Sequence, residues 1–267
     1  MHEVGPEMDE TIVHAYGVVA PNASFSRFPA GIADTRVRVH TVENLAAIVG
    51  LLPVAGFGVA NWEENATNVR WLEQVARRHN EVLQYAATTG DVVPLRLPSL
   101  YGNLDSLADT LRSSGDRLER ALQRIQGKLE WSVKIYRSAK QEDPPVTPEA
   151  ASGRDYLLAR SRNLSARRTA REQLVEQVLE IHETLGHTSA EYVRNQPQDA
   201  ALSGRKEQML LNGAYLVARA DQNRFLDLVD EIADRPSTNG LLLEVGGPWP
   251  AYNFTGDVDA TTRQVTG

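Results

Sequence analysis

The sequence contains no cysteine among its 267 residues. This absence excludes disulfide bridges, thiol nucleophiles and thiolate metal ligands together, and it fits a reducing compartment. Basic residues are fewer than acidic ones: the chain has 28 Lys and Arg and 35 Asp and Glu, which gives a net charge of −7. Nucleic-acid binding needs a concentrated basic surface, so this balance argues against nucleic acid as the main partner.

Long apolar runs are lacking as well. The one candidate membrane segment, residues 45–60, is shorter than the roughly 20 apolar residues that span a bilayer, and Gly50 and Pro53 interrupt it. Residues 1–10 are polar and acidic, without the basic-then-apolar order of a secretory signal. We therefore expect a cytoplasmic protein with no membrane partner.

The usual catalytic and metal-binding motifs are missing too. The chain has no Gly-Lys-Ser/Thr phosphate loop and no Gly-x-Ser-x-Gly elbow. His182 and His187 resemble the two histidines of a zinc helix, but their spacing would turn them roughly 140° apart on a helix. Gly56 and Gly58 match only part of a dinucleotide loop. We expect no catalytic residues, no cofactor-binding residues and no metal site.

The first half of the chain alternates strand and helix patterns. The predicted strands are residues 11–20, 36–41 and 45–52, with an edge strand at 92–97 because Pro94 cannot donate to a sheet ladder. Apolar residues at three- and four-residue spacing predict helices at 65–87 and 104–125, the second with a break near Gly115. Val69 and Leu72 belong to the apolar stripe of the first helix. His79 lies among the apolar positions of the first helix, which favours a hydrogen-bonded core histidine over a ligand.

The second half has the order of a ferredoxin-like fold. Strand patterns at 130–136, 190–195, 210–219 and 241–245 alternate with helices at 154–185 and 221–235 in the order β-α-β-β-α-β. A proline-rich loop at 141–153 precedes the long helix, and Gly246-Gly247-Pro248 is expected to end the last strand. We predict an α+β protein with a disordered lead-in at 1–10, an N-terminal α+β domain at 11–126, a modified ferredoxin-like domain with a closing tail at 127–256, and a disordered tail at 257–267.

An arginine cluster marks the start of the long helix. Its members are Arg154, Arg160, Arg162, Arg167, Arg168 and Arg171. Acidic residues such as Glu172 are interleaved with them, and aromatic stacking residues are nearly absent. The pattern favours a solvated, salt-bridged helix face over a site for nucleic acid or an acidic partner.

The closing segment carries proline-spaced aromatic residues. Pro248 and Pro250 favour an extended backbone and remove amide donors, while Trp249, Tyr252 and Phe254 supply large apolar surfaces. These aromatics could present themselves to a partner, but packing back onto the second domain is the favoured interpretation.

This closing pattern, Gly-Pro-Trp-Pro-x-Tyr-x-Phe, resembles the hallmark of the GvpF/GvpL family of gas vesicle proteins. Other blocks resemble that family in order: Tyr-Gly-Val-Val at 16–19, Arg-His-Asn-Glu-Val-Leu at 78–83, Val-Pro-Leu-Arg-Leu at 93–97, Glu-Trp-Ser-Val-Lys at 130–134, and Gly-Arg-Asp-Tyr-Leu at 153–157. The family commonly continues the third block with Phe-Gly-Thr, where this chain has Leu97-Pro98-Ser99. The resemblance covers residues 11–256.

The resemblance implies a minor, non-enzymatic protein associated with the gas vesicle. Proteins of this kind bind the small hydrophobic shell protein GvpA and other gas vesicle accessory proteins, and assist nucleation and assembly. Two α+β domains are implied, the second with a modified ferredoxin-like fold. The alternative is a small-ligand-binding regulator or an enzyme on the same scaffold, because a fold does not dictate a function.

The charge-free stretch at 54–62 is the candidate partner-binding site. Its large apolar residues are Val54, Phe57, Val59 and Trp62, and its glycines predict a loop outside regular structure. A contiguous exposed apolar patch commonly marks an interaction site. A buried loop is an equally compatible interpretation.

Overall fold

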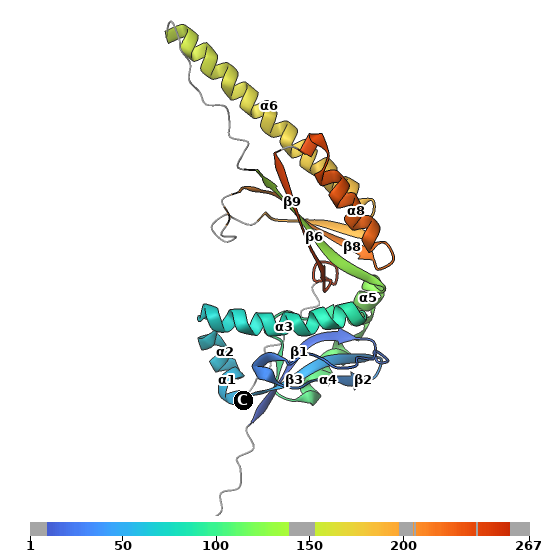
Figure 1. Ribbon diagram of the computed structural model, residues 1–267. Helices are drawn as coiled ribbons and strands as arrows, with labels where there is room; N and C mark the ends of the chain where they lie inside the picture. The colour runs from blue at the N-terminus through green and yellow to red at the C-terminus, as the bar shows by residue number, and fades with distance from the viewer. Residues whose placement is uncertain (1–9, 139–152, 198–204, 206, 239, 257–267) are drawn as a thin grey trace, which may run out of the picture. The chain divides into compact units, whose positions relative to one another are not determined.

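The computed structural model describes residues 10–138, 153–197, 205, 207–238 and 240–256. Contacts between Cα atoms divide the chain into unit 1, Met1–Glu130 with Pro248–Gly267, and unit 2, Trp131–Gly247 (Figure 1). Apart from Glu10 and Gly153, the ends expected to be disordered and the proline-rich loop lie outside the described residues.

Unit 1 is built on an antiparallel sheet. Its strands are β1 (Thr11–Val19), β2 (Val37–Val42), β3 (Leu45–Pro53), β4 (Val93–Pro94) and β5 (Leu100–Tyr101). The order is β2-β3-β1-β4, with β5 also paired to β1, so β4 is an edge strand as predicted. Every residue of β1 after Thr11 is buried, which shows that both faces of this strand are covered.

Helices cover the sheet of unit 1. They are the 3-10 turn η1 (Ile32–Asp34), α1 (Val54–Phe57), α2 (Val59–Asn65), α3 (Val69–Thr89), α4 (Leu104–Ser113) and α5 (Gly115–Ile125). The apolar face of α3 places Val75, Val82 and Leu83 in the core against Tyr16 and Ile48 of the sheet. The break between α4 and α5 confirms the interruption predicted near Gly115.

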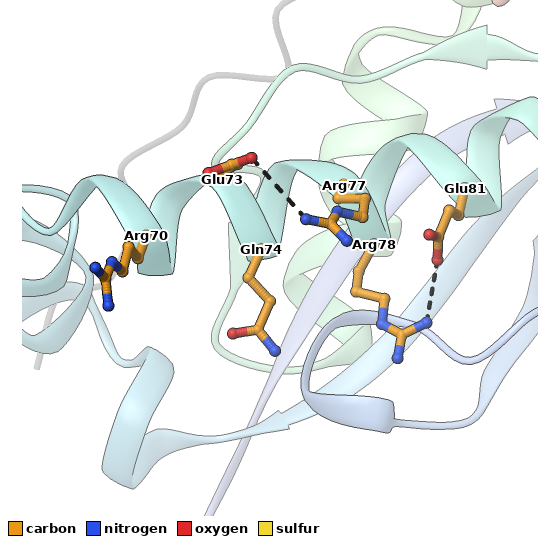
Figure 2. Close-up of a pocket in the computed structure, with 6 residues that line it drawn as sticks. All are labelled: Arg70, Glu73, Gln74, Arg77, Arg78 and Glu81. Carbon is orange, nitrogen blue, oxygen red and sulfur yellow. Dashed lines mark hydrogen bonds and ion pairs between the residues drawn. The ribbon is translucent and has the colours of Figure 1, made fainter.

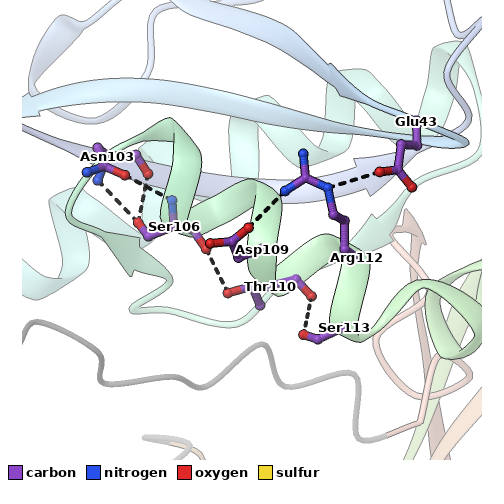
Figure 3. Close-up of polar contacts among 7 residues, drawn as sticks. All are labelled: Glu43, Asn103, Ser106, Asp109, Thr110, Arg112 and Ser113. Carbon is purple, nitrogen blue, oxygen red and sulfur yellow. Dashed lines mark hydrogen bonds and ion pairs between the residues drawn. The ribbon is translucent and has the colours of Figure 1, made fainter.

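The start and the end of α4 are held by polar side chains (Figure 3). The Asn103 side chain accepts a hydrogen bond from the Ser106 backbone amide at 2.9 Å, and the Ser106 hydroxyl approaches the Asn103 amide in return. Such a capping box satisfies amides that the first helical turn leaves unpaired. At the other end, Arg112 pairs with Glu43 of the β2–β3 turn at 3.0 Å and with Asp109 at 2.8 Å. These contacts tie α4 to the sheet edge.

Unit 2 contains a second antiparallel sheet. Its strands are β6 (Lys128–Arg137), β7 (Glu191–Asn195), β8 (Met209–Ala218) and β9 (Leu241–Trp249), in the order β7-β8-β6-β9, and β6 and β9 each cross the boundary between the units. Its helices are α6 (Gly153–Gly186) and α8 (Gln222–Ala233), with the 3-10 turn η2 (Pro236–Thr238). Alternate residues Trp131, Val133 and Ile135 of β6 pack into one core with α6 and α8, which agrees with the strand predicted at 130–136.

Three local predictions differ from the structure. The stretch at 54–62 is not a loop but two short helices, α1 and α2. The edge strand predicted at 92–97 is shorter in the structure, where β4 comprises Val93 and Pro94, although the Leu95 amide still donates to the Tyr16 carbonyl at 2.9 Å. Strand β9 continues through Gly246 and Gly247 to Trp249, because extended proline and glycine are compatible with a strand end.

Candidate partner-binding surface

An aromatic cluster joins α1, α2 and the start of α3. The Trp62 and Trp71 rings meet edge to face at 5.1 Å between centroids, and the Phe57 ring lies 5.7 Å from Trp71. Trp62 is buried at 6% exposure, whereas Phe57 and Trp71 are half-buried. Asn61 and Asn65 donate to the carbonyls of Val54 and Gly56, which holds α1 and α2 together. The cluster therefore forms a firm corner on unit 1.

Exposed apolar side chains surround this cluster. Val59 on α2 is 36% exposed, and Val69 and Leu72 at the start of α3 are 76% and 39% exposed. Val69 and Leu72 are three residues apart, so they are neighbours on the helix surface. Among the large apolar side chains described in unit 1, only these three and Trp249 are exposed. We call Phe57, Val59, Val69, Trp71 and Leu72 the corner surface.

The four candidate partner-binding residues at 54–62 therefore differ in how deeply they are buried. Trp62 is interior and Val54 packs against the core, while Phe57 and Val59 reach the surface. The sequence pattern assigned Val69 and Leu72 to the buried stripe of the helix and so missed their exposure. Helical periodicity identifies a face, but it does not tell which turn extends beyond the sheet.

Figure 2 shows a group of polar side chains on α3, which we call the polar shelf. It is lined by Arg70, Glu73, Gln74, Arg77, Arg78 and Glu81, around a shallow pocket of about 420 Å³. Arg77 approaches Glu73 at 3.9 Å, and Arg78 binds Glu81 at 3.1 Å and Asp34 at 2.8 Å. Exposed pairs of this kind contribute little stability, so the shelf is a solvated rim to the apolar surface.

The closing segment packs on unit 1, not on the second domain as expected. The Gln84 side chain of α3 donates to the Pro248 carbonyl, and the Tyr252 hydroxyl lies 3.5 Å from the Asn80 side-chain oxygen. Phe254 is fully buried, Pro250 is buried, and Tyr252 packs at the edge of the core of unit 1. Phe254 is therefore packed inside the protein, and the hydrogen bonds between the closing segment and α3 involve Pro248 and Tyr252.

A buried carboxylate secures the end of this segment. Glu130 is 5% exposed and accepts two hydrogen bonds from Asn253, one from the backbone amide at 2.9 Å and one from the side-chain amide at 2.6 Å. Burial raises the pKa of Glu130, and the two Asn253 hydrogen bonds oppose that rise. Both Asn253 groups donate hydrogen bonds, which an ionised carboxylate accepts. The Glu130–Asn253 pair, which we call the clasp, therefore links the start of β6 to the closing segment.

Trp249 has a different environment from Phe254. It is 44% exposed and borders an open groove of about 850 Å³ along α3. The groove is lined by Arg27, Phe28, Pro29, Arg77, Asn80, Glu81, Gln84, Tyr85, Thr88 and Trp249. The Phe28 and Tyr85 rings meet at 5.4 Å between centroids. The groove is mainly apolar and has no nucleophile paired with a base among its lining residues.

The described residues show no arrangement that defines a reaction. His79 is buried and bonded to His14 and to the Leu95 carbonyl, which confirms the prediction of a hydrogen-bonded core histidine. His182 shares a hydrogen bond of 2.6 Å with the Tyr215 hydroxyl inside unit 2. Across the described ranges, no three His, Asp or Glu side chains gather as they would around a metal ion. No described helix combines the length and the apolar character needed to cross a membrane.

The fold and the closing segment together match a family of gas vesicle proteins. The profile of the family described as gas vesicle synthesis protein GvpL/GvpF matches residues 12–256. The chain belongs to this family.

Individual relatives agree with this assignment. Gas vesicle protein L of a Streptomyces species (strain CB03234) is 33% identical over 85% of this chain and 85% of its own length. Gas vesicle protein F2 of Halobacterium salinarum is 24% identical over 92% of this chain and 93% of its own length.

Solved structures show the same fold. The crystal structure of GvpF from Anabaena sp. PCC7120 superposes with a TM-score of 0.68 at 17% identity, over 92% of this chain and 96% of the other. GvpF from Microcystis aeruginosa superposes with a TM-score of 0.65 at 17% identity, over 91% and 98%. Both have the mixed arrangement of helices and two antiparallel sheets seen here.

Proposed function

We propose that this protein is a gas vesicle accessory or minor structural protein that binds the small hydrophobic shell protein GvpA and assists vesicle nucleation and assembly without catalysis. Family membership over residues 12–256 is the observation that carries the proposal. The absence of a catalytic grouping among the described residues is compatible with it, since an assembly role needs a surface and not a reaction centre. The protein would accordingly act at the gas vesicle, alongside the other accessory proteins.

The corner surface is our candidate for the contact with the shell protein. An apolar partner is recognised by apolar area removed from water, at roughly 25 cal/mol per Å². Val59, Val69 and Leu72 offer such area on a rigid support, because the Trp62–Trp71 contact holds the helices beneath them. The charged shelf of α3 would form a polar rim, as partner-binding surfaces commonly have.

We also infer that unit 2 is a modified ferredoxin-like domain. Its elements follow the order β-α-β-β-α-β, and its sheet has the first strand between the third and the fourth. The fold is modified by the length of its first helix, because α6 has 34 residues whereas α8 has 12. Unit 1 would then be the N-terminal α+β domain, with the closing segment as its last element.

A binding assay with tagged GvpA tests the function and the site separately. Leu72→Asp and Val69→Asp place a charge on the corner surface at exposed positions, so both variants should fold and bind GvpA at least about tenfold more weakly. Leu242→Asp on β9, with a similar exposure of 44%, is the matched control and should bind normally. A wild-type protein that fails to bind GvpA would refute the function. Normal binding by Leu72→Asp would refute only the site.

A further inference from the structure

Within the described part of the chain, no other element covers the N-terminal part of α6. Every described side chain from Arg160 to Gln173 is exposed, and Figure 1 shows this part of α6 extending past the sheet of its own unit. An isolated helix of this length is marginal in water, so its contacts with other groups matter for its stability. We call residues 160–175 the arm.

Charge and apolar residues gather on one side of the arm. At about 100° per residue, Arg160, Leu164, Arg167, Arg168, Arg171 and Val175 fall within one stripe about 100° wide, whereas Arg162 points away from it. Leu164 and Val175 are 59% and 49% exposed. The arm holds five arginines and one glutamate, Glu172, which pairs with Arg168 at 2.9 Å. Its surface is therefore strongly basic, with two exposed apolar anchors.

The same unit carries an acidic stripe of matching length on α8 and on Asp234, the residue that caps its C-terminal end. Asp227, Asp230, Glu231 and Asp234 follow the spacing i, i+3, i+4, i+7, and all four are exposed. Glu231 is bound by Arg235 at 2.8 Å, but no ion pair engages the three aspartates within the described part of the chain. The seven-residue interval from Asp227 to Asp234, about 10.5 Å, equals that from Arg160 to Arg167. Two ion pairs can therefore form at once between an arm and an α8 helix.

We propose that the arm of one molecule docks on the α8 face of a second copy of this chain. The two stripes differ in charge, match in spacing and lie at different places on the unit, so the contact is heterologous. Contacts of this kind propagate into rings or open chains of molecules. The protein would thus form head-to-tail assemblies, which goes beyond binding to the shell protein and does not depend on it.

The chemistry of the arm favours a protein partner over a nucleic acid. Leu164 and Val175 lie in the basic stripe, where apolar contact is useful against another helix. No aromatic side chain for base stacking occurs between Arg160 and Gly186. The net charge of −7 also makes the rest of the chain an acidic partner for its own arm.

The oligomeric state of the purified full chain tests this proposal. Sedimentation velocity over a concentration series should show assemblies larger than a dimer at about 0.1 M salt that dissociate at about 1 M salt, because screening weakens exposed ion pairs. Arg160→Glu should weaken association on the order of tenfold, since like charges then face each other. Arg162→Glu makes the same charge change off the stripe and should leave association unchanged.

A charge reversal distinguishes the proposed contact from a general effect of charge. Arg160→Glu with Arg167→Glu, or Asp227→Arg with Asp234→Arg, should each abolish assembly, and all four substitutions in one chain should restore it. A protein that stays monomeric at low salt would overturn the proposal, as would equal effects of Arg160→Glu and Arg162→Glu. Salt-sensitive binding of a DNA or RNA oligonucleotide by a monomer, lost in Arg160→Glu, would also overturn it and assign the arm to nucleic acid.

Discussion

His14 in β1 and His79 in α3 are joined by a hydrogen bond of 3.0 Å between Nε2 of His14 and Nδ1 of His79, in the interior of unit 1. Nε2 of His79 also lies 3.0 Å from the Leu95 carbonyl oxygen, which can only accept. His79 must therefore donate through Nε2, and its Nδ1 accepts from Nε2 of His14. The remaining nitrogen, Nδ1 of His14, is buried without a hydrogen-bond partner among the described residues.

This network predicts one tautomer for each ring. At neutral pH both His14 and His79 should carry their proton on Nε2, because any other assignment leaves two acceptors or two donors facing each other. Nitrogen-15 chemical shifts of the two imidazoles, measured by long-range proton–nitrogen correlation, report the tautomer directly. A proton on Nδ1 of either ring would contradict the network.

The same pair predicts that stability decreases in mild acid. Burial lowers the pKa of both histidines, that of His79 to about 4, and repulsion between the two rings lowers the pKa of His14 further. The unfolded chain therefore binds protons first as the pH falls below about 6.5. The free energy of unfolding should be fully retained above that pH. It should decline toward pH 4 by up to about 1.4 kcal/mol per pH unit for each histidine.

Urea unfolding at about pH 7.5 and about pH 5.5 measures this slope, a range in which few carboxylates titrate. His14→Phe keeps an aromatic ring in the core but removes one titrating group, so it should flatten the pH dependence whatever its effect at neutral pH. An unchanged slope in His14→Phe would exclude the pair as its source.

The two aromatic residues at the ends of the closing segment should differ in their contribution to stability. Phe254 is fully buried, so Phe254→Ala should lower the free energy of unfolding by about 3–5 kcal/mol. Trp249 is 44% exposed, so Trp249→Ala should cost only about 1 kcal/mol. Urea denaturation of both variants decides the ranking. A larger loss in Trp249→Ala would show that the groove beside it is the principal anchor.

The clasp between Glu130 and Asn253 should also be measurable. Asn253→Ala removes the side-chain hydrogen bond of 2.6 Å from a buried carboxylate, which should cost about 1–3 kcal/mol. Asn212→Ala, which removes a more exposed hydrogen bond of 3.2 Å in unit 2, is the comparison and should cost less. Equal losses in the two variants would indicate that Glu130 finds another partner once Asn253 is gone.

Gly186, at the end of α6, should not tolerate a methyl group. A Cβ at this position would lie 2.6 Å from the Tyr192 ring, which is held in place because its hydroxyl donates to Glu183 at 2.6 Å. Gly186→Ala should therefore cost about 1–3 kcal/mol through overpacking. Gly102→Ala is the control, since no atom beyond its own residue and chain neighbours lies within 4 Å of its Cβ position, and should stay within about 0.5 kcal/mol of wild type. A thermal or urea unfolding series compares the two.

The sequence alone determined most elements and their order. Hydrophobic periodicity is local, so the long helices α3 and α6 and the alternating strand β6 could be recognised from a few turns or residues. The predictions are wrong at Val54–Trp62 and at Gly246–Trp249, where glycine and proline indicate breaks but the structure has two short helices and the end of a strand. Glycine and proline disfavour a helix or a strand, but they do not exclude it where neighbouring elements supply hydrogen bonds.

Only the tertiary structure decided which surfaces these elements share. The closing segment identified the family from its residue pattern, but its place on α3 depends on Gln84 and Asn80, more than 160 residues earlier in the chain. The pairing of His14 with His79 and the burial of Trp62 in the core of unit 1 likewise depend on contacts between distant segments. A periodic pattern specifies which face of an element is apolar. Whether that face is buried depends on what packs against it, and that is a property of the folded chain.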